Sequence, residues 1–320
     1  MKALGLAALL SLSAIAMTRP GSAQVLESYQ GPCDASAAVA VGSDTFVVGN
    51  DEDNTLRVYR RGQAPAIASI TLSRFLDATA AEVDIEGAAA IGSRIYWISS
   101  HGRNNNGAAE PARHRIFAVE LREGPTPVLE PVGTPYTSLL RDLEASEALK
   151  PYRLDAAARR PAEADGGLNI EGLAATPDGR LLIGFRNPLT AQRALVVPLE
   201  NPADVVAGKR ARLGAPIVLD LDGRGIRSIE LVGTGYEIVA GPTADRGRFA
   251  LYRWSGAAAD APVLAADVDL GDLRPEALFA VPAAPRVQLL SDDGGIEVGG
   301  KACKKHAAQR QVFRSLTVGR

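Results

Sequence analysis

Short apolar runs that alternate with turns recur along the chain. The segment DIEGAAAIGSRIYWISSHGRN (84–104) joins two strand-like runs through a Gly-Ser turn, and NIEGLAATPDGRLLIGFRNPL (169–189) repeats the pattern around a Pro-Asp-Gly turn. Apolar and aromatic runs bounded by such turn residues are typical of β-hairpins. Another copy begins at Cys33, and two weaker copies begin at Ile226 and Leu273. The pattern therefore predicts a repeat protein with five hairpin units.

Two further strand-like runs follow each of the first four hairpins, as HRIFAVEL and PVLEPVG do after the second. Four antiparallel strands per unit are typical of a β-propeller blade. After the fifth hairpin a single run remains, RQVFRSLTV, so we expect residues 25–30 to pair with the strand near 311–318 and to complete that blade. The sequence thus predicts an all-β fold, with one β-propeller domain over residues 24–320.

The segment between the second and third hairpins decides the number of blades. It is the longest of the intervals and contains TSLLRDLEASEALKPYRLDAAARR (137–160), whose leucines fit a helical stripe. Because it holds no further glutamate hairpin, we interpret it as a helical insertion after blade two. Five blades are therefore favoured, and the alternative is six, with a degenerate blade inside this segment.

The N-terminal residues resemble a secretory signal peptide. Lys2 precedes an apolar run, and a stretch of small residues ends at Ala23. The apolar run is too short for a membrane span, and no later segment is long and apolar enough for one. We therefore expect residues 1–23 to be removed and the mature protein to be periplasmic or secreted, with no membrane span.

Charge and cysteine content narrow the possible partners. The formal net charge of −2 gives no general attraction to nucleic acid, so a nucleic-acid partner is not expected. The two cysteines, Cys33 and Cys303, are not clustered with other metal ligands. In an exported protein an even count favours a disulfide between them, and the alternative is a pair of free buried thiols. We expect a monomer.

One position of the repeat carries a glutamate in four of the five copies. Because the first strand of each propeller blade lines the central channel, these side chains are expected to surround one mouth of it. Four converging carboxylates repel one another unless a cation compensates, and Ca²⁺ prefers such oxygen ligands. Alternatively, the glutamates are structural and close the ring through hydrogen bonds to neighbouring blades. The predicted metal ligands are Glu86, Glu171, Glu230 and Glu276, and the first copy has Ser36 instead.

The end of the second strand in each blade should reach the same mouth. Counting along the repeat places Asp51, His101 and Arg186 there, with Arg103 two residues after the histidine. Histidine is suited to acid–base chemistry near neutral pH, and arginine binds carboxylate and phosphate oxygens. His101, Arg186 and Arg103 are therefore the candidate catalytic residues, although a loop histidine is also often simply hydrogen-bonded.

Several segments together resemble the bacterial family known as domain of unknown function 3616. They are GPCDASAAVAVGSDTFVVGNDEDNTLRVYR, DIEGAAAIGSRIYWISSHGRN, GLNIEGLAATPDGRLLIGFRNPL and the spaced ending DDGG, CKK and FRS. The resemblance covers nearly the whole mature chain but implies little about activity. The Glu-Gly-Leu-Ala hairpin is also similar to that of the phytase-like esterase family. A glutamate-bearing mouth resembles those of calcium-dependent apyrases and gluconolactonase-type propellers, which implies a metal there.

Three functions are consistent with these features. The first is a metal-assisted hydrolase of phosphate esters or other small anionic esters, with Ca²⁺ as the cofactor and a small anionic molecule as the substrate. The second is a lactonase or sugar-ester hydrolase, in which His101 or a carboxylate handles the proton. The third is a non-enzymatic propeller that binds a ligand or partner at its mouth. Fold-level analogy does not decide between them.

Overall fold

The computed structural model describes residues 24–122, 124, 127–244 and 246–320. The predicted signal peptide, residues 1–23, lies outside the described residues. Among the residues that are described, no helix is long and apolar enough to cross a lipid bilayer.

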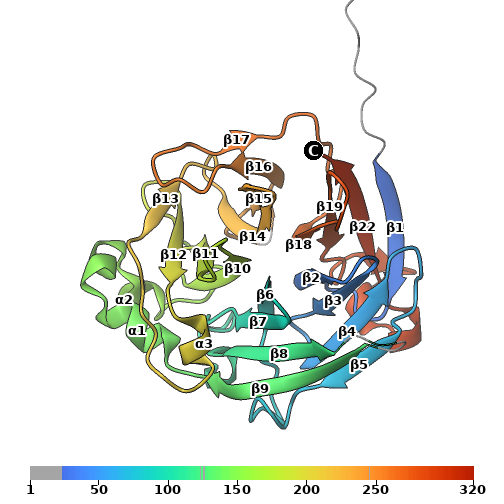
Figure 1. Ribbon diagram of the computed structural model, residues 1–320, viewed down its shortest axis with the longest axis horizontal. Helices are drawn as coiled ribbons and strands as arrows, with labels where there is room; N and C mark the ends of the chain where they lie inside the picture. Colours follow the sequence, from blue (N-terminus) through green and yellow to red (C-terminus); the bar gives the residue numbers. More distant parts are fainter. Residues whose placement is uncertain (1–23, 123, 125–126, 245) are drawn as a thin grey trace, which may run out of the picture.

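Five four-stranded antiparallel sheets surround a central axis, with the first strand of each repeat innermost (Figure 1). The fold is therefore a five-bladed β-propeller, as predicted. Blade one consists of β2 (Ala37–Val41), β3 (Thr45–Gly49), β4 (Thr55–Arg60) and β5 (Ala68–Thr71). Blade two consists of β6 (Ile85–Ile91), β7 (Arg94–Ser99), β8 (Ile116–Arg122) and β9 (Val128–Tyr136). Blade three consists of β10 (Asn169–Ala175), β11 (Leu181–Asn187), β12 (Ala194–Leu199) and β13 (Ile217–Leu219). Blade four consists of β14 (Gly225–Val232), β15 (Gly235–Gly241), β16 (Ala250–Trp254) and β17 (Val263–Leu264).

Blade five is built from both ends of the chain. It contains β18 (Pro275–Ala280), β19 (Arg286–Ser291), β22 (Val312–Gly319) and, at its outer edge, β1 (Val25–Gln30). The N-terminal β1 pairs antiparallel with the C-terminal β22, which confirms the predicted closure. Tyr29 of β1 fixes this pairing, since its ring stacks on Phe313 at 5.5 Å and meets Phe46 of blade one edge-on at 5.1 Å.

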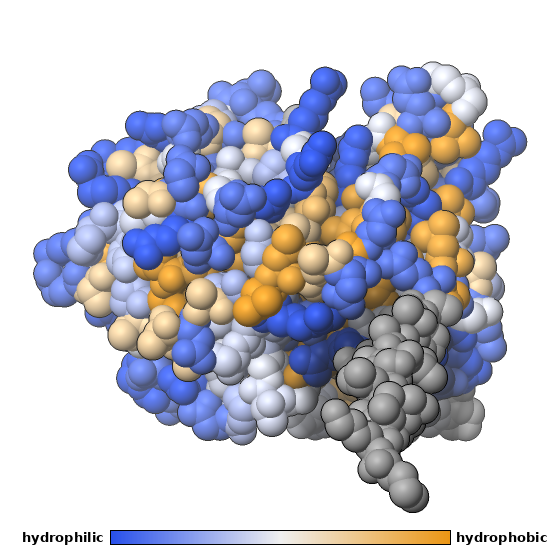
Figure 2. All heavy atoms as spheres, turned by 90° about the horizontal axis from the view of Figure 1, so that it is seen from above, coloured by the Kyte–Doolittle hydropathy of each residue, from blue (hydrophilic) through white to orange (hydrophobic). Residues whose placement is uncertain are grey.

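The core lies between neighbouring blades. Each sheet buries apolar residues on both faces, as strands covered on two sides must. Between blades five and one the contact is mainly aromatic, with Phe46 stacked on Phe279 at 5.0 Å. Seven large apolar side chains are exposed among the described residues, all of them on strands. In the side view of Figure 2, apolar residues are interspersed with hydrophilic ones.

The long segment after β9 is a helical insertion, as predicted. It contains α1 (Leu139–Ala145), the 3₁₀ helix η2 (Glu147–Tyr152) and α2 (Leu154–Ala157). Their buried leucines extend the apolar core between blades two and three. The remaining short elements are η1 (Pro111–Arg113), α3 (Pro202–Val205), the hairpin β20 (Glu297–Val298) and β21 (Lys301–Ala302), η3 (Cys303–Lys305) and η4 (Ala308–Arg310).

A disulfide joins Cys33, just before β2, to Cys303 in η3. Both cysteines are buried, and 270 positions of sequence separate them. The predicted bridge is therefore confirmed. It connects blade one to the long loop of blade five, so it lies across the seam where the chain closes the ring.

A bulge interrupts the innermost strand at the same place in blades two to five. The pairing shifts register between the residues on either side of Glu86, Glu171, Arg227 and Glu276. A bulge re-aims the side chain at the extra residue, so these four occupy one equivalent position. Glycine follows the first two because space there is short: a Cβ on Gly87 would lie 3.0 Å from the carbonyl oxygen of Glu171.

Candidate functional site at the channel mouth

A cavity of about 440 Å³ opens where the innermost strands begin. We call it the mouth cavity. Its lining is almost entirely polar, with nine carboxylic acids, four basic residues and four asparagines. The acids are Asp51, Glu52, Glu82, Asp84, Glu86, Glu163, Glu171, Glu276 and Asp292, the basic residues Arg113, Arg186, Arg227 and Lys304, and the asparagines Asn104, Asn105, Asn106 and Asn169.

On the side of blades three to five, the carboxylates are neutralised by arginines. Nη1 of Arg186 donates to Oε1 of Glu171 at 2.9 Å, and Nε of Arg227 lies 3.0 Å from Oε2 of the same carboxylate. Nη2 of Arg227 also contacts Glu276. All four side chains are buried. Buried charges need such partners, so this part of the ring requires no bound cation.

Glu230, a predicted metal ligand, does not belong to this group. Glu230 lies on β14 three residues after Arg227, where it pairs with Glu237 of β15. It is not among the residues that line the mouth cavity. The bulge places Arg227 at the equivalent position instead. The predicted ring of four glutamates is therefore three glutamates and one arginine, which removes much of the expected repulsion.

On the side of blades five, one and two, acids predominate. Burial, the hydrogen bond with the Asp292 carboxyl and the charge of Asp51 raise the pKa of Asp34 to about 10. Burial and the charges of Asp84 and Asp292 raise the pKa of Asp51 to about 8. Burial raises the pKa of Asp84 to about 6. Like charges and poor solvation disfavour ionisation here, and a bound cation would reverse both effects.

Glu86 lies at the junction of these two sides. Its side chain lines the mouth cavity and the residue is 8% exposed, yet it makes no hydrogen bond or ion pair with any residue that the structure describes. Burial, followed by the charges of Glu171 and Asp84, raises its pKa well above the usual value. Oδ1 of the buried Asn169 also lacks a hydrogen-bond partner within the described chain. These oxygens fit the preferences of a hard divalent cation.

His101 does not reach the mouth cavity. It is fully buried, its Nδ1 lies 2.8 Å from the carbonyl oxygen of Ser99, and its ring stacks on His114 at 5.5 Å. Burial and the neighbouring His114 lower the pKa of His101 to about 3. It also has a left-handed backbone conformation, with φ of 56°, so counting along the strand misjudged its direction. Its placement gives the predicted acid–base role no support.

Arg103 holds the helical insertion rather than lining the mouth cavity. Its Nε donates to the carbonyl oxygen of Ala158 at 2.9 Å, and Nη1 donates to that of Gly107 at 2.8 Å. Of the three candidate catalytic residues, Arg186 alone lines the cavity among the described residues.

Sequence reasoning missed two arginines of the site. Arg227 was missed because the repeat was aligned on its glutamates. In the structure the bulge at Ile226-Arg227-Ser228 is equivalent to the bulge at Ile85-Glu86-Gly87, so Arg227 occupies the position of Glu86. Arg113 pairs with Asp84 at 3.1 Å and comes from the loop between β7 and β8, which carries no repeat signal.

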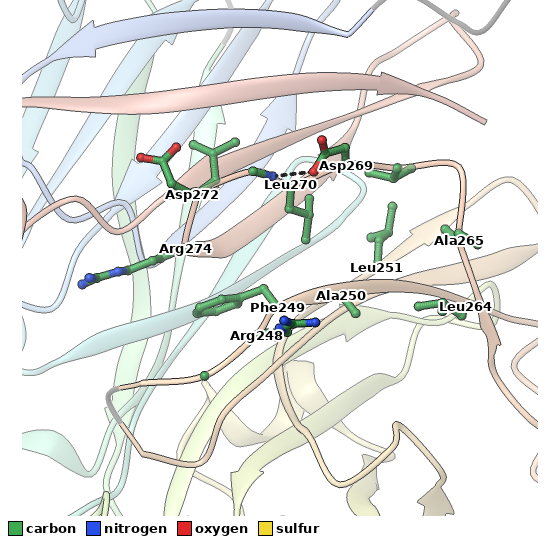
Figure 3. Close-up of a pocket in the computed structure, with 15 residues that line it drawn as sticks. Arg248, Phe249, Ala250, Leu251, Leu264, Ala265, Asp269, Leu270, Asp272 and Arg274 are labelled. Atoms are coloured by element: carbon green, nitrogen blue, oxygen red, sulfur yellow. Dashed lines mark hydrogen bonds between the residues drawn. The ribbon is translucent and has the colours of Figure 1, made fainter.

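A second pocket of about 610 Å³ lies between blades four and five (Figure 3). Its lining includes Phe249, Leu251 and Leu270, and none of the predicted site residues. The Asp269 carboxylate accepts the hydrogen bond drawn there, from the N–H of Gly271 at 2.9 Å. Phe249 connects this pocket to the mouth cavity, because the guanidinium of Arg227 lies 5.4 Å from the centre of its ring.

Comparison with solved structures finds several proteins of similar shape. Glutaminyl cyclase from Myxococcus xanthus is 12% identical, with 94% of this chain and 100% of that chain covered and a TM-score of 0.46. A putative oxidoreductase (glucose dehydrogenase) from Thermus thermophilus is 14% identical, with coverage of 92% and 100% and a TM-score of 0.45. A luciferin-regenerating enzyme is 9% identical, with coverage of 93% and 96% and a TM-score of 0.47. Similarities at this level carry no argument about activity.

Comparison with curated proteins finds no match. A family model, described as a protein of unknown function (DUF3616), matches residues 34–120 and 133–285. These residues include blades one, three and four, most of blade two and the first strand of blade five, together with Glu86, Glu171 and Glu276. The chain therefore belongs to the DUF3616 family.

Proposed function

We propose that this protein is an exported hydrolase that acts on small anionic esters, such as phosphate esters, with the help of a divalent cation at the channel mouth. The observation that carries the proposal is the Glu86 carboxylate, which is buried against the mouth cavity and makes no hydrogen bond or ion pair with a described residue. Ca²⁺ suits it best, because this ion takes several carboxylate, amide and water oxygens in a flexible arrangement.

Glu86, Asp84 and Asn169 are the residues that would hold the cation, from the first strands of blades two and three or just before them. A bound divalent cation supplies positive charge that polarises an ester or phosphoryl oxygen. Arg186 and Arg227 hold the Glu171 carboxyl group in place, so that it can orient a polar group of the substrate. Without a cation, the excess of acids in the lining would repel an anionic substrate. Activity is therefore expected to depend strictly on the metal.

Export is supported by the predicted signal peptide and by the disulfide. A buried bridge of this kind is typical of oxidising compartments and rare in the reducing cytosol.

The cation site can be tested by calorimetric titration of the mature protein with Ca²⁺. Glu86→Gln should weaken binding by about tenfold or more, since it removes one charged ligand at nearly constant shape. Glu230→Gln is the matched control, because this glutamate lies in a neighbouring first strand but outside the mouth cavity. Equal affinity of the wild type and the Glu86→Gln protein would show that Glu86 is not a ligand.

Activity can be tested with phosphomonoesters, phytate, nucleotides and lactones, each with Ca²⁺ and with a chelator. Metal-dependent turnover of phosphorylated substrates, lost in Glu86→Gln and retained in Glu230→Gln, is the expected result. Turnover of lactones alone would favour a lactonase or sugar-ester hydrolase instead.

The second candidate is a non-enzymatic propeller that binds a ligand or partner at its mouth. It is favoured by the engagement of Arg186 and Arg227 with carboxylates and by the burial of His101 away from the cavity. Ca²⁺ binding without turnover of any substrate in the panel would support it.

A further inference from the structure

The ammonium group of Lys304 lies beside the acidic side of the mouth. Carboxylate oxygens of Asp34, Asp51 and Glu52 all lie within 4.8 Å of one another, a spacing that a single metal ion can bridge. Nζ of Lys304 lies 2.5 Å from Oε1 of Glu52. The ammonium group therefore supplies positive charge to the same carboxylates that a metal ion would use.

The disulfide anchors both parts of this arrangement. Asp34 directly follows Cys33, and Lys304 directly follows Cys303, so the bridge ties the lysine to the acids. Backbone hydrogen bonds strengthen the connection: the N–H of Asp293 donates to the carbonyl oxygen of Cys33 at 2.9 Å, and that of Lys304 donates to Gly294 at 3.2 Å. The tether therefore gives the Lys304 ammonium group a high effective concentration at the carboxylates of the mouth.

Two features indicate that this lysine does not satisfy the site permanently. Its side chain is 45% exposed, so it can turn into solvent without disturbing the core. Glu86, which lines the same cavity, still makes no hydrogen bond or ion pair with a described residue while Lys304 is engaged with Glu52. The demand for positive charge therefore exceeds what one ammonium group supplies.

We propose that Lys304 is a tethered counter-ion that competes with a divalent cation for Asp34, Asp51 and Glu52, and that the Cys33–Cys303 disulfide sets the strength of this competition. The inference rests on the proposed binding of a divalent cation at the mouth. It extends that site from Glu86 and Asp84 to the neighbouring carboxylates, of which Asp51 and Glu52 line the same cavity. On binding, the metal takes the carboxylate oxygens and the ammonium group moves into solvent. The tethered lysine thereby sets the metal concentration at which the site fills.

The test is calorimetric titration of the oxidised, full mature chain with Ca²⁺. Lys304→Ala should bind about five- to tenfold more tightly than the wild type, because the competing charge is gone. Lys305→Ala is the matched control, since it removes the same charge one residue away, where no contact with the acids exists among the described residues. In the Cys33→Ser/Cys303→Ser background, Lys304→Ala should change the affinity much less, because the lysine is no longer held at the mouth.

The outcomes separate this inference from the proposed function. Ca²⁺ binding that is equal in the wild type and Lys304→Ala, or weaker in the variant, overturns the competition and leaves the cation site standing. Absence of Ca²⁺ binding in the wild type and in both lysine variants overturns the cation site and the competition together. If the cysteine variant does not fold, Lys304→Met in the disulfide-bonded protein decides the competition, since it keeps most of the side-chain length without the charge.

Discussion

Nε of Arg227 in blade four lies 3.0 Å from Oε2 of Glu171 in blade three. Arg227 also contacts Glu276 in blade five, so one guanidinium connects three consecutive blades. All three side chains are buried, and Arg186 supplies the second positive charge. The innermost strands are therefore held together by paired charges at the mouth as well as by the apolar core between blades.

Replacing Arg227 with methionine should destabilise the protein by about 3 to 5 kcal/mol, because two buried carboxylates lose a partner. Lys150→Met is the control: its ion pair with Glu147 is solvent-exposed and should contribute about 1 kcal/mol or less. Urea unfolding of the two variants measures the difference. Similar losses in both would mean that Arg227 is not essential to the charge balance.

The blades were predictable from the sequence because their signals are local. Turn glycines such as Gly92 and Gly179 have positive φ angles of 63° and 81°, and apolar runs flank them, so each hairpin is recognisable by itself. The bulge at Glu86, where the pairing with β7 skips one residue between Ile85 and Gly87, is not visible in a single sequence. It depends on how a neighbouring blade packs.

The mouth was predictable in its location but not in its partners. Asp51 and Arg186 were placed correctly by counting along the repeat, because strands alternate in direction. Arg227 was missed because the repeat was aligned by residue type. His101 was misplaced because its left-handed φ turns the chain at the strand end. Ion pairs between blades join residues that are far apart in sequence, and no periodic pattern reports them.

The closure of the ring can be tested at Tyr29. Tyr29→Ala should destabilise the whole domain by about 3 to 5 kcal/mol, since it empties a fully buried aromatic site between blades five and one. Leu26→Ala, in the same strand but 61% exposed, should change stability by about 0.5 kcal/mol or less. Thermal unfolding followed by circular dichroism distinguishes the two. Fraying of β1 without a lower melting temperature in Tyr29→Ala would contradict closure by this strand.

Loss of the disulfide should also weaken the closed ring. The bridge constrains a loop of 270 positions in the unfolded chain, and a cross-link of that span stabilises by about 3 to 5 kcal/mol. The Cys33→Ser/Cys303→Ser protein should therefore unfold at lower urea concentration than the oxidised wild type. Thiol titration of the unfolded wild type provides the control for the oxidised state, since it should detect no free thiol before reduction. Unchanged unfolding without the bridge would mean that β1 alone closes the ring.

The buried His101 should make the protein sensitive to acid. Its pKa is about 3 in the folded state and about 6.5 in the unfolded chain, so between these values only the unfolded state binds the proton. The contribution of His101 to stability therefore falls as the pH drops from about 6.5 towards 3, by up to about 1.4 kcal/mol per pH unit. The mouth acids Asp34, Asp51 and Asp84 contribute with the opposite sign, because their raised pKa values let the folded state bind more protons than the unfolded chain in this range.

His101→Asn isolates the histidine contribution, because asparagine tolerates the left-handed φ of 56° and does not titrate. The unfolding free energy of the wild type, measured relative to that of this variant, should fall as the pH drops from 6.5 to 5, because His101 binds a proton only in the unfolded chain over that range. NMR titration of the His101 ring checks the cause directly. A ring that becomes protonated near pH 6.5 in the folded protein would rule out burial as the source of the acid sensitivity. A ring that stays neutral down to about pH 4 would also show that His101 cannot serve as an acid–base group in hydrolysis near neutral pH, which leaves the carboxyl groups of the mouth to move the proton.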